Sequence, residues 1–151
     1  MQAIFVDAWA WIAMAHEGDQ WHELAAAEAR RLADRGARLV TRNLALCEAY
    51  TGLARWASHD TVEELRDRVV RSALDRRGLS IVYADSALEG LAWDIFSRHR
   101  DSRFSFPDCV AFALMRRERI QTAFTGDRHF RQMGFSTVPA ELPASGVGAT
   151  P

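Results

Sequence analysis

The sequence predicts a single α/β domain, in which a mostly parallel sheet of four to five strands is flanked by helices on both faces. Short apolar runs alternate with longer helical patterns over 151 residues, which is about the length of one domain. Glycines follow several of the helical patterns and precede the next apolar run, as expected where a helix ends. Strands that are separated by helices favour parallel pairing and helices on both faces of the sheet.

Apolar runs of strand length mark the expected strands. They cover residues 3–7, 38–41, 79–83 and 121–125, with a weaker fifth run at 136–138. Gly36, Gly78 and Gly134 stand shortly before three of these runs. Glycine tolerates the left-handed conformation that commonly terminates a helix, so these positions are expected to close the preceding helices.

Helical patterns fill the intervals between the strands. They cover residues 8–16, 20–35, 43–57, 60–76, 85–99, 106–118 and 127–133. The residues expected at helix N-caps are Asn43, Asp60 and Asp85. Asp60 with Glu63, and Ser105 with Asp108, have the spacing of a capping box. Pro107 falls in the first turn of its helix, where its missing N–H costs little.

Composition narrows the function classes. All nineteen basic residues are arginines, which excludes reactions that need a lysine, and the net charge of −1 gives no overall attraction to nucleic acid. Cys47 and Cys109 lie among apolar neighbours without a Cys/His cluster, so both are expected to be buried, reduced thiols, and zinc is not expected. Without an N-terminal leader pattern or a long apolar run, the protein is expected in the cytoplasm. The domain is expected to span residues 1–139, with a flexible tail at 140–151.

Four acids stand where the predicted strands end or the predicted helices begin. They are Asp7, Glu48, Asp108 and Asp127. Because ligands bind at the carboxyl ends of parallel strands, these side chains are expected to converge at one edge of the sheet. A cluster of carboxylate oxygens suits Mg²⁺ or Mn²⁺, and such a site points to phosphodiester chemistry.

Glu48 is the most informative of these acids. It is the only charged residue between Arg42 and Arg55, in a helix whose first two turns are apolar nearly all round. Such a helix is expected to be buried, so its carboxylate requires a cation or hydrogen-bond donors. A structural ion pair with Arg42 or Arg55 is the alternative, although neither arginine has the three- or four-residue spacing that brings helical side chains together.

The other acids have structural alternatives of similar weight. Asp7 and Asp127 can each cap the helix that follows, and Asp108 can complete a capping box with Ser105. Capping leaves one carboxylate oxygen free, so it does not exclude metal binding. Asp101 lies in an Arg-rich loop and is a second-tier candidate beside a plain role as a solvated loop residue.

At these residues the chain resembles the PIN-domain ribonucleases, specifically the VapC-type toxins of prokaryotic toxin–antitoxin pairs. The segments that carry the resemblance are residues 4–12, 40–48, 104–109 and 123–135. The resemblance implies a PIN-like domain and a catalytic set of Asp7, Glu48, Asp108 and Asp127. Of these, it implies Asp7, Asp108 and Asp127 as metal ligands, with hydroxyl-bearing Ser105 and Thr125 beside the site.

Two residues depart from the pattern of that family. Ala8 and Trp9 follow Asp7 where a Thr or Ser is usual, so a hydroxyl that would orient Asp7 is missing. Pro107 stands where a Thr is common and is expected to be harmless at a helix start. The loss at Ala8 leaves open a PIN-fold binding module of weakened activity as the alternative to an active enzyme. A receiver domain and a haloacid-dehalogenase-like phosphatase fit poorly, because both use a lysine.

The resemblance further implies a ribonuclease that uses two Mg²⁺ or Mn²⁺ ions and cleaves single-stranded or loop RNA. Arginines near the rim of the site could steer RNA phosphates, and those expected there are Arg42, Arg103 and Arg128. Of Trp9 and Trp11 only one can face the cleft, while Trp56 and Trp93 are expected in the core or in an interface. The Trp21 region and the helices at 43–76 are expected to dock an antitoxin, and a homodimer is expected from the family.

Overall fold

The computed structural model describes residues 1–75, 78–140 and 142 of the chain. Within this part, five strands form one sheet in the order β3-β2-β1-β4-β5, and all neighbouring pairs are parallel. The strands are β1 (Ala3–Val6), β2 (Arg38–Arg42), β3 (Leu79–Val82), β4 (Thr122–Phe124) and β5 (Ser136–Val138). The expected parallel α/β fold is confirmed, including the weak fifth strand.

Seven helices connect these strands in the described part of the chain. They are α1 (Ala8–Ala15), α2 (His22–Asp34), α3 (Asn43–Trp56), α4 (His59–Leu74), α5 (Ser86–Arg98), α6 (Phe106–Arg117) and α7 (Arg128–Gln132). Every helix expected from the sequence is present, with ends within two residues of the prediction. Gly36, Gly78 and Gly134 have positive φ angles of 64°, 84° and 89°, as expected after helix ends.

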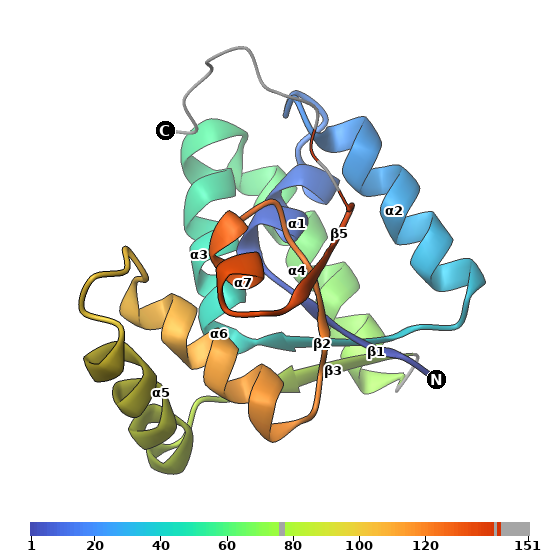
Figure 1. Cartoon of the computed structure of the whole chain (residues 1–151). Coiled ribbons are helices and arrows are strands. Elements are labelled where there is room, and N and C mark those ends of the chain that lie inside the picture. Colours follow the sequence, from blue (N-terminus) through green and yellow to red (C-terminus); the bar gives the residue numbers. More distant parts are fainter. Residues whose placement is uncertain (76–77, 141, 143–151) are drawn as a thin grey trace.

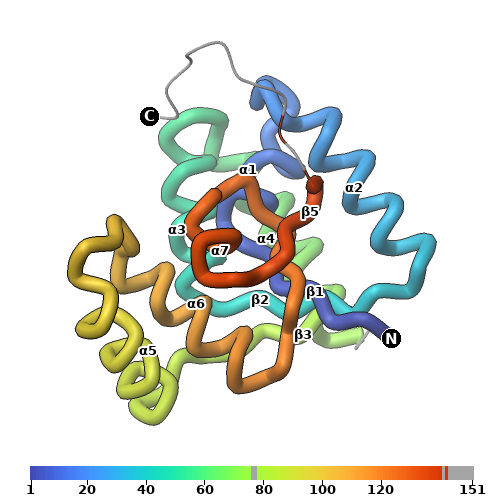
Figure 2. Tube along the Cα trace, in the orientation of Figure 1, coloured from blue at the N-terminus to red at the C-terminus, as the bar shows by residue number. Residues whose placement is uncertain are grey.

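Helices lie on both faces of the sheet (Figures 1 and 2). An apolar cluster fills the space on each face. One joins Phe5, Val40 and Ala123 of the sheet to buried residues of α5, α6 and α7. The other joins Ile4 and Val6 to α1, α2, α3 and α4. Neighbouring residues of a strand point to opposite faces, so the apolar run of β1 is buried on both sides.

The strand order reverses beside β1. The chain passes from β1 to β2 on one side, and β4 joins β1 on the other side. In parallel sheets this reversal opens a crevice at the carboxyl ends of the central strands. Here those ends lead into Asp7 after β1, Arg42 at the end of β2, and Thr125 after β4.

Several local expectations are corrected by the structure. Ser58 caps α4 through a hydrogen bond from the Thr61 amide, so Asp60 lies in the first turn instead and forms no capping box with Glu63. Arg42 holds the N-cap position of α3, and the Asn43 side chain accepts a hydrogen bond from Ala84 N at 3.3 Å. The Ser58 hydroxyl accepts from one of the free amides at the start of the helix, and Asp60 already lies within the first turn, so Ser58 is the cap.

Other caps agree with the prediction. Asp85 caps α5 by accepting a hydrogen bond from the Leu88 amide at 2.8 Å. Ser105 and Asp108 form a complete capping box at the start of α6, with Pro107 in its first turn. Pro107 is therefore compatible with the helix start, as expected.

Helix α3 is amphipathic rather than buried on all sides. Cys47 and Glu48 are exposed, while Ala45, Leu46 and Ala49 are buried. The expectation of a buried Cys47 is therefore wrong, whereas Cys109 is buried as expected. The buried side of α3 carries Ala45, Leu46, Ala49, Gly52 and Leu53, whereas its exposed side carries Cys47, Glu48, Thr51 and Arg55.

The expected flexible tail at 140–151 lies almost wholly outside the described residues. Within the described part, no helix is long and apolar enough to cross a membrane.

Candidate metal centre

Backbone hydrogen bonds beyond the strand ends bring Asp7 and Thr125 to the same edge of the sheet. The Asp7 amide donates to Phe124 O at 3.1 Å, and the Thr125 amide donates to Val138 O at 3.0 Å. Both bonds extend the parallel pairing by one residue past the strands. The side chains of Asp7 and Thr125 are thereby placed next to each other at the crevice.

The Thr125 hydroxyl joins two of the acids. It donates a hydrogen bond to Asp7 Oδ2 at 2.9 Å and accepts one from the Asp127 amide at 3.0 Å. Thr125 is almost fully buried, so its hydroxyl cannot turn to water instead. This contact gives the Asp7 carboxylate one hydroxyl partner.

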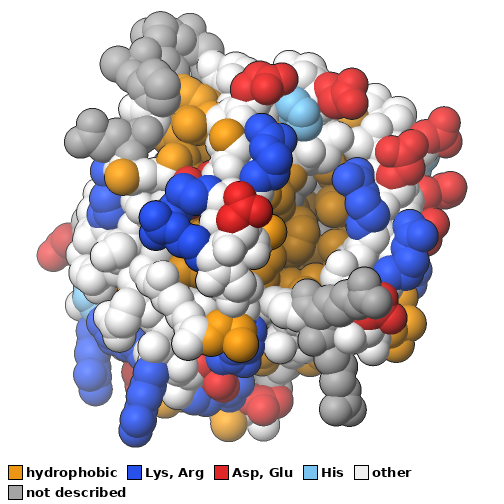
Figure 3. Space-filling model, turned by 90° about the vertical axis from the view of Figure 1, so that its right-hand side faces the viewer, with side chains coloured by type: hydrophobic (Ala, Val, Ile, Leu, Met, Phe, Trp, Pro, Cys, Tyr) orange, Lys and Arg blue, Asp and Glu red, His pale blue; other side chains and the backbone are white. Residues whose placement is uncertain are grey.

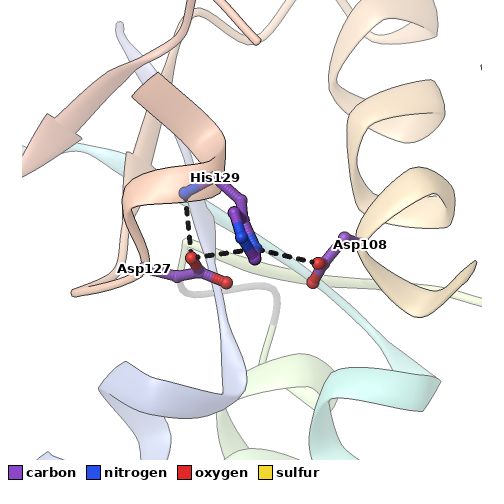
Figure 4. Close-up of side chains that lie close together, drawn as sticks. All are labelled: Asp108, Asp127 and His129. Carbon is purple, nitrogen blue, oxygen red and sulfur yellow. Dashed lines mark hydrogen bonds and ion pairs between the residues drawn. The ribbon is translucent and has the colours of Figure 1, made fainter. Parts of the chain in front are cut away.

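Asp127 and His129 continue the network toward α6 (Figure 4). Asp127 caps α7 by accepting a hydrogen bond from the His129 amide at 2.9 Å. The His129 ring then turns back, with Nδ1 lying 3.3 Å from Asp127 Oδ1 and 3.2 Å from Asp108 Oδ2. Asp127 thus has the capping role that its sequence position suggested, and it also takes part in the acidic cluster.

Asp108 is fixed at the first turn of α6. Its Oδ2 accepts a hydrogen bond from the Ser105 amide at 3.0 Å, and its own amide donates to Ser105 Oγ at 3.1 Å. The ring of Phe104 stands edge-on to His129, with centroids 5.4 Å apart, and holds the imidazole from the side. The carboxylate is therefore positioned by the capping box and still faces the other acids.

Glu48 lies on the exposed side of α3, but its carboxyl group is partly buried by the neighbouring groups of the cluster. Partial burial raises the pKa of Glu48, the Arg42 guanidinium lowers it, and the Asp7 and Asp108 carboxylates raise it again. The deeper Asp7 has a pKa that burial raises, while Arg42 and the Thr125 hydroxyl lower it in part. Glu48 and Asp7 therefore share one electrostatic environment with Asp108 and Arg42.

The residues of this pocket fit a divalent cation. One donor atom each of Asp108, Asp127 and His129 lies within 4.8 Å of the others, and all three side chains are partly exposed. Carboxylate oxygens with one imidazole nitrogen suit Mn²⁺ or Mg²⁺. Burial, and to a smaller extent the neighbouring carboxylates, raises the pKa of Asp7 and Glu48. A divalent cation bound among these groups would favour their ionised forms.

The two tryptophans after Asp7 divide as expected. Trp11 is buried and donates from Nε1 to Thr41 Oγ1 at 3.0 Å. Trp9 is half-buried and lies over Gly126, where an added Cβ would be 2.5 Å from its Cε2 atom. Trp93 and Trp56 are exposed by 59% and 39%, so neither belongs to the core.

Some expected site residues lie apart from the pocket. Asp101 is exposed in a turn, and the structure gives it no contact with the four acids within the described residues. Arg103 and Arg128 are exposed, which agrees with a place on the rim. Arg42 is not on the rim, because only 1% of its surface is exposed. Its position at the end of an apolar strand was the sequence signal for burial.

The sequence alone did not single out His129 as a site residue. Its Nδ1 contacts two acids that are nineteen residues apart in sequence, Asp108 and Asp127. The available signal was an Asp-x-His motif at a helix start, which turns the imidazole back over its own N-cap. That motif is short, and its function depends on α6 being packed nearby.

Comparisons with known proteins agree on one family. The family model described as "PIN domain" matches residues 4–136. Two curated proteins, from the CDC 1551 / Oshkosh and H37Rv strains of Mycobacterium tuberculosis, carry the name "23S rRNA-specific endonuclease VapC20". Each is 33% identical to this chain over 140 residues, covering 91% of this chain and 99% of the relative.

A solved structure gives the same result. It is the crystal structure of Mycobacterium tuberculosis VapC20, described as a sarcin–ricin loop cleaving toxin. It superposes with a TM-score of 0.72 at 30% sequence identity, covering 87% of this chain and 95% of that one. The sequence match and the structural match therefore agree on the fold and the family.

Proposed function

This chain belongs to the PIN domain family, and we propose that it is a metal-dependent endoribonuclease, the toxin of a toxin–antitoxin pair that acts on RNA in the cytoplasm. The observation that carries the proposal is the network that joins Asp7, Asp127 and Asp108 through Thr125 and His129. It lies at the strand-order reversal of a parallel sheet, where such folds place their ligands.

We assign Asp7, Asp108 and Asp127 as ligands of Mg²⁺ or Mn²⁺, with His129 as a further donor and Glu48 as an additional catalytic carboxylate. When bound, a divalent ion lowers the pKa of an attacking water and stabilises charge on the phosphate. Thr125 holds one oxygen of Asp7, and Ser105 holds Asp108 through the capping box. The Thr125 hydroxyl and the Ser105 amide thus fix the two carboxylates before substrate arrives, which lowers the cost of ordering them.

The RNA substrate is proposed to be a loop of ribosomal RNA. Curated relatives are named for 23S rRNA, and the solved relative is described as cleaving the sarcin–ricin loop. Loops present unpaired bases that proteins can read, whereas the grooves of an RNA duplex hide them. The exposed Arg103 and Arg128 precede Asp108 and follow Asp127 in sequence, so they can contact phosphates that flank the cleaved bond.

Partner proteins are proposed at two apolar surfaces. A groove of about 480 Å³ between α1, α2 and α4 is lined by side chains that include Met14, Leu65, Arg68 and Val69, and Figure 3 shows an apolar hollow on the face carrying α2. An apolar helix of an antitoxin would fit such a groove. The exposed Trp93, with Leu91 and Phe96 on α5, supports a homodimer contact.

The alternative is a PIN-fold binding module of weakened activity, which rests on the missing hydroxyl after Asp7. Against it stands the hydrogen bond that the Thr125 hydroxyl donates to Asp7. All four acids are present at the crevice or directly beside it. An active site is therefore the function that the geometry supports best.

The test is cleavage of a synthetic sarcin–ricin stem-loop and of 23S rRNA by the purified protein. We expect cleavage with Mn²⁺ or Mg²⁺, none with excess EDTA, and at least a hundredfold loss for Asp108→Asn. The matched control is Asp101→Asn, an equal charge change in an exposed loop, which should keep full activity. Cleavage by Asp108→Asn at the rate of the control would overturn the assignment.

A further inference from the structure

Arg42 is a buried cation whose hydrogen bonds are not satisfied by the protein. It is 1% exposed, and its Nε and Nη1 atoms have no hydrogen-bond partner among the described residues. Burying an unpaired charge is costly, and buried guanidinium groups normally have a carboxylate or carbonyl partner. Packing alone therefore does not explain why an arginine occupies this buried position.

Sheet register places Arg42 inside the acidic pocket. Phe5 of β1 pairs with Val40 of β2, so two residues further along Asp7 and Arg42 lie side by side at the carboxyl edge. Side chains alternate between faces, and Phe5 and Val40 belong to the cluster beneath α6. Asp7 and Arg42 therefore share the sheet face on which α6 carries Asp108.

The guanidinium acts on the carboxylates through space rather than through an ion pair. Nε and Nη1 of Arg42 have no hydrogen-bond partner, and no ion pair between the guanidinium and a carboxylate is found in the described part of the chain. Arg42 nevertheless lowers the pKa of Asp7 and Glu48, and burial lowers the pKa of Arg42 itself. The guanidinium therefore interacts electrostatically with several carboxylates and forms an ion pair with none of those in the described residues.

We propose that Arg42 is a fixed internal counter-charge of the acidic pocket, which weakens the binding of divalent cations and restricts the pocket to one such ion. The proposal rests on the metal-dependent function above. One positive charge buried among the carboxylates repels an incoming cation, and this repulsion is strong where water is excluded. Arg42 also cancels one of the four negative charges, so the pocket has less need of a second ion.

The proposal contrasts with a purely structural role. If Arg42 only fills space at the end of β2, an apolar residue of similar length should leave metal binding unchanged. If it is a counter-charge, removing the charge should strengthen metal binding, whereas lysine should preserve it. Arg38, at the opposite end of the same strand and exposed, provides the control for the loss of one positive charge from the protein.

The experiment is calorimetric titration of Mn²⁺ into the apo-protein, with the rise of Tm on adding Mn²⁺ as a second readout. We expect one Mn²⁺ per wild-type chain. Arg42→Met should bind the first ion at least tenfold more tightly or take up a second ion, with a larger rise in Tm. Arg42→Lys and Arg38→Met should behave as the wild type. Since each protein is compared with itself with and without metal, a general loss of stability in Arg42→Met does not affect the comparison.

Three outcomes would overturn the proposal. In the first, Arg42→Met binds Mn²⁺ with wild-type affinity and stoichiometry, while Asp108→Asn abolishes binding. This result would support the metal site and refute only the counter-charge role of Arg42. Another is unchanged Mn²⁺ binding with weakened RNA binding, which would make Arg42 a phosphate contact. Binding of Mn²⁺ to neither the wild type nor Arg42→Met would overturn the metal-dependent function together with the counter-charge. Where Arg42→Met does not fold, Arg42→Gln replaces it with the same expected results.

Discussion

The buried hydroxyl of Thr125 offers the sharpest test of how the acidic pocket is held together. Replacing Thr125 with valine keeps the shape of the side chain and removes the hydroxyl. The change deletes the hydrogen bond to Asp7 Oδ2 at 2.9 Å and leaves the Asp127 amide without its acceptor at 3.0 Å. Thr125 itself is 1% exposed, whereas Asp7 and Asp127 are partly exposed, so water can replace the lost partners only in part.

The magnitude follows from these two bonds. A hydrogen bond to a charged group contributes about 1.5–3 kcal/mol and a neutral one about 1 kcal/mol. The additional buried methyl group of valine recovers up to about 0.8 kcal/mol. The free energy of unfolding should therefore fall by about 2–3 kcal/mol, which corresponds to a Tm lower by about 4–12 °C for a domain of this size.

The assay is urea and thermal unfolding in EDTA, so that bound metal does not contribute. Thr125→Ser is the control, since it keeps the hydroxyl and loses only a methyl group, at a cost of about 1 kcal/mol. We expect the stability order wild type, then serine, then valine. A valine variant as stable as the wild type, or more stable than the serine variant, would show that the hydroxyl does not hold Asp7 and Asp127 in place.

The remaining predictions concern the pocket and the thiols. In a calorimetric titration, His129→Gln should weaken Mn²⁺ binding at least tenfold. His129→Asn should retain most of the binding, because its side-chain amide takes the place of Nδ1. Equal losses in the two variants would contradict a role of Nδ1 in binding the ion. Gly126→Ala drives a Cβ into the neighbouring indole and should lower both Tm and Mn²⁺ affinity, whereas Gly90→Ala meets no atom within 4 Å and should raise Tm slightly. Burial raises the pKa of Cys109 to about 11, so a thiol reagent at pH 8 should label only the exposed Cys47 until the protein unfolds. Rapid labelling of two thiols in the native protein would contradict this burial.

The fold was readable from the sequence because its signals are local. Apolar runs of strand length, the helical patterns between them and the glycines that end helices predicted a mostly parallel sheet of four to five strands and seven helices. The described part of the chain has five strands, all parallel, and seven helices. Ser105 and Asp108 were expected to form a capping box for the same reason, since both partners lie within one turn. Asp60 was wrongly expected to cap α4, because Ser58, two residues upstream, caps that helix instead.

The site was readable only in part. The four acids were identified from their places at strand ends and helix starts, and the structure brings Asp7, Asp108 and Asp127 into one network. The role of His129 and the burial of Arg42 were missed. Both depend on neighbours that are distant in the sequence, since α6 must pack beside α7 for the first and β1 must pair with β2 for the second.

The sequence by itself determined which elements form and which acids lie at the carboxyl edge of the sheet, because hydrophobic periodicity and capping act within a few residues. Only the tertiary structure decided how those acids are connected. Thr125 donates to Asp7 because the pairing of β1 with β4 sets two residues 118 positions apart side by side. In the same way, the pairing of β1 with β2 sets a positive charge beside Asp7. The electrostatics of the pocket depend on distances through space, which the order of residues along the chain does not contain.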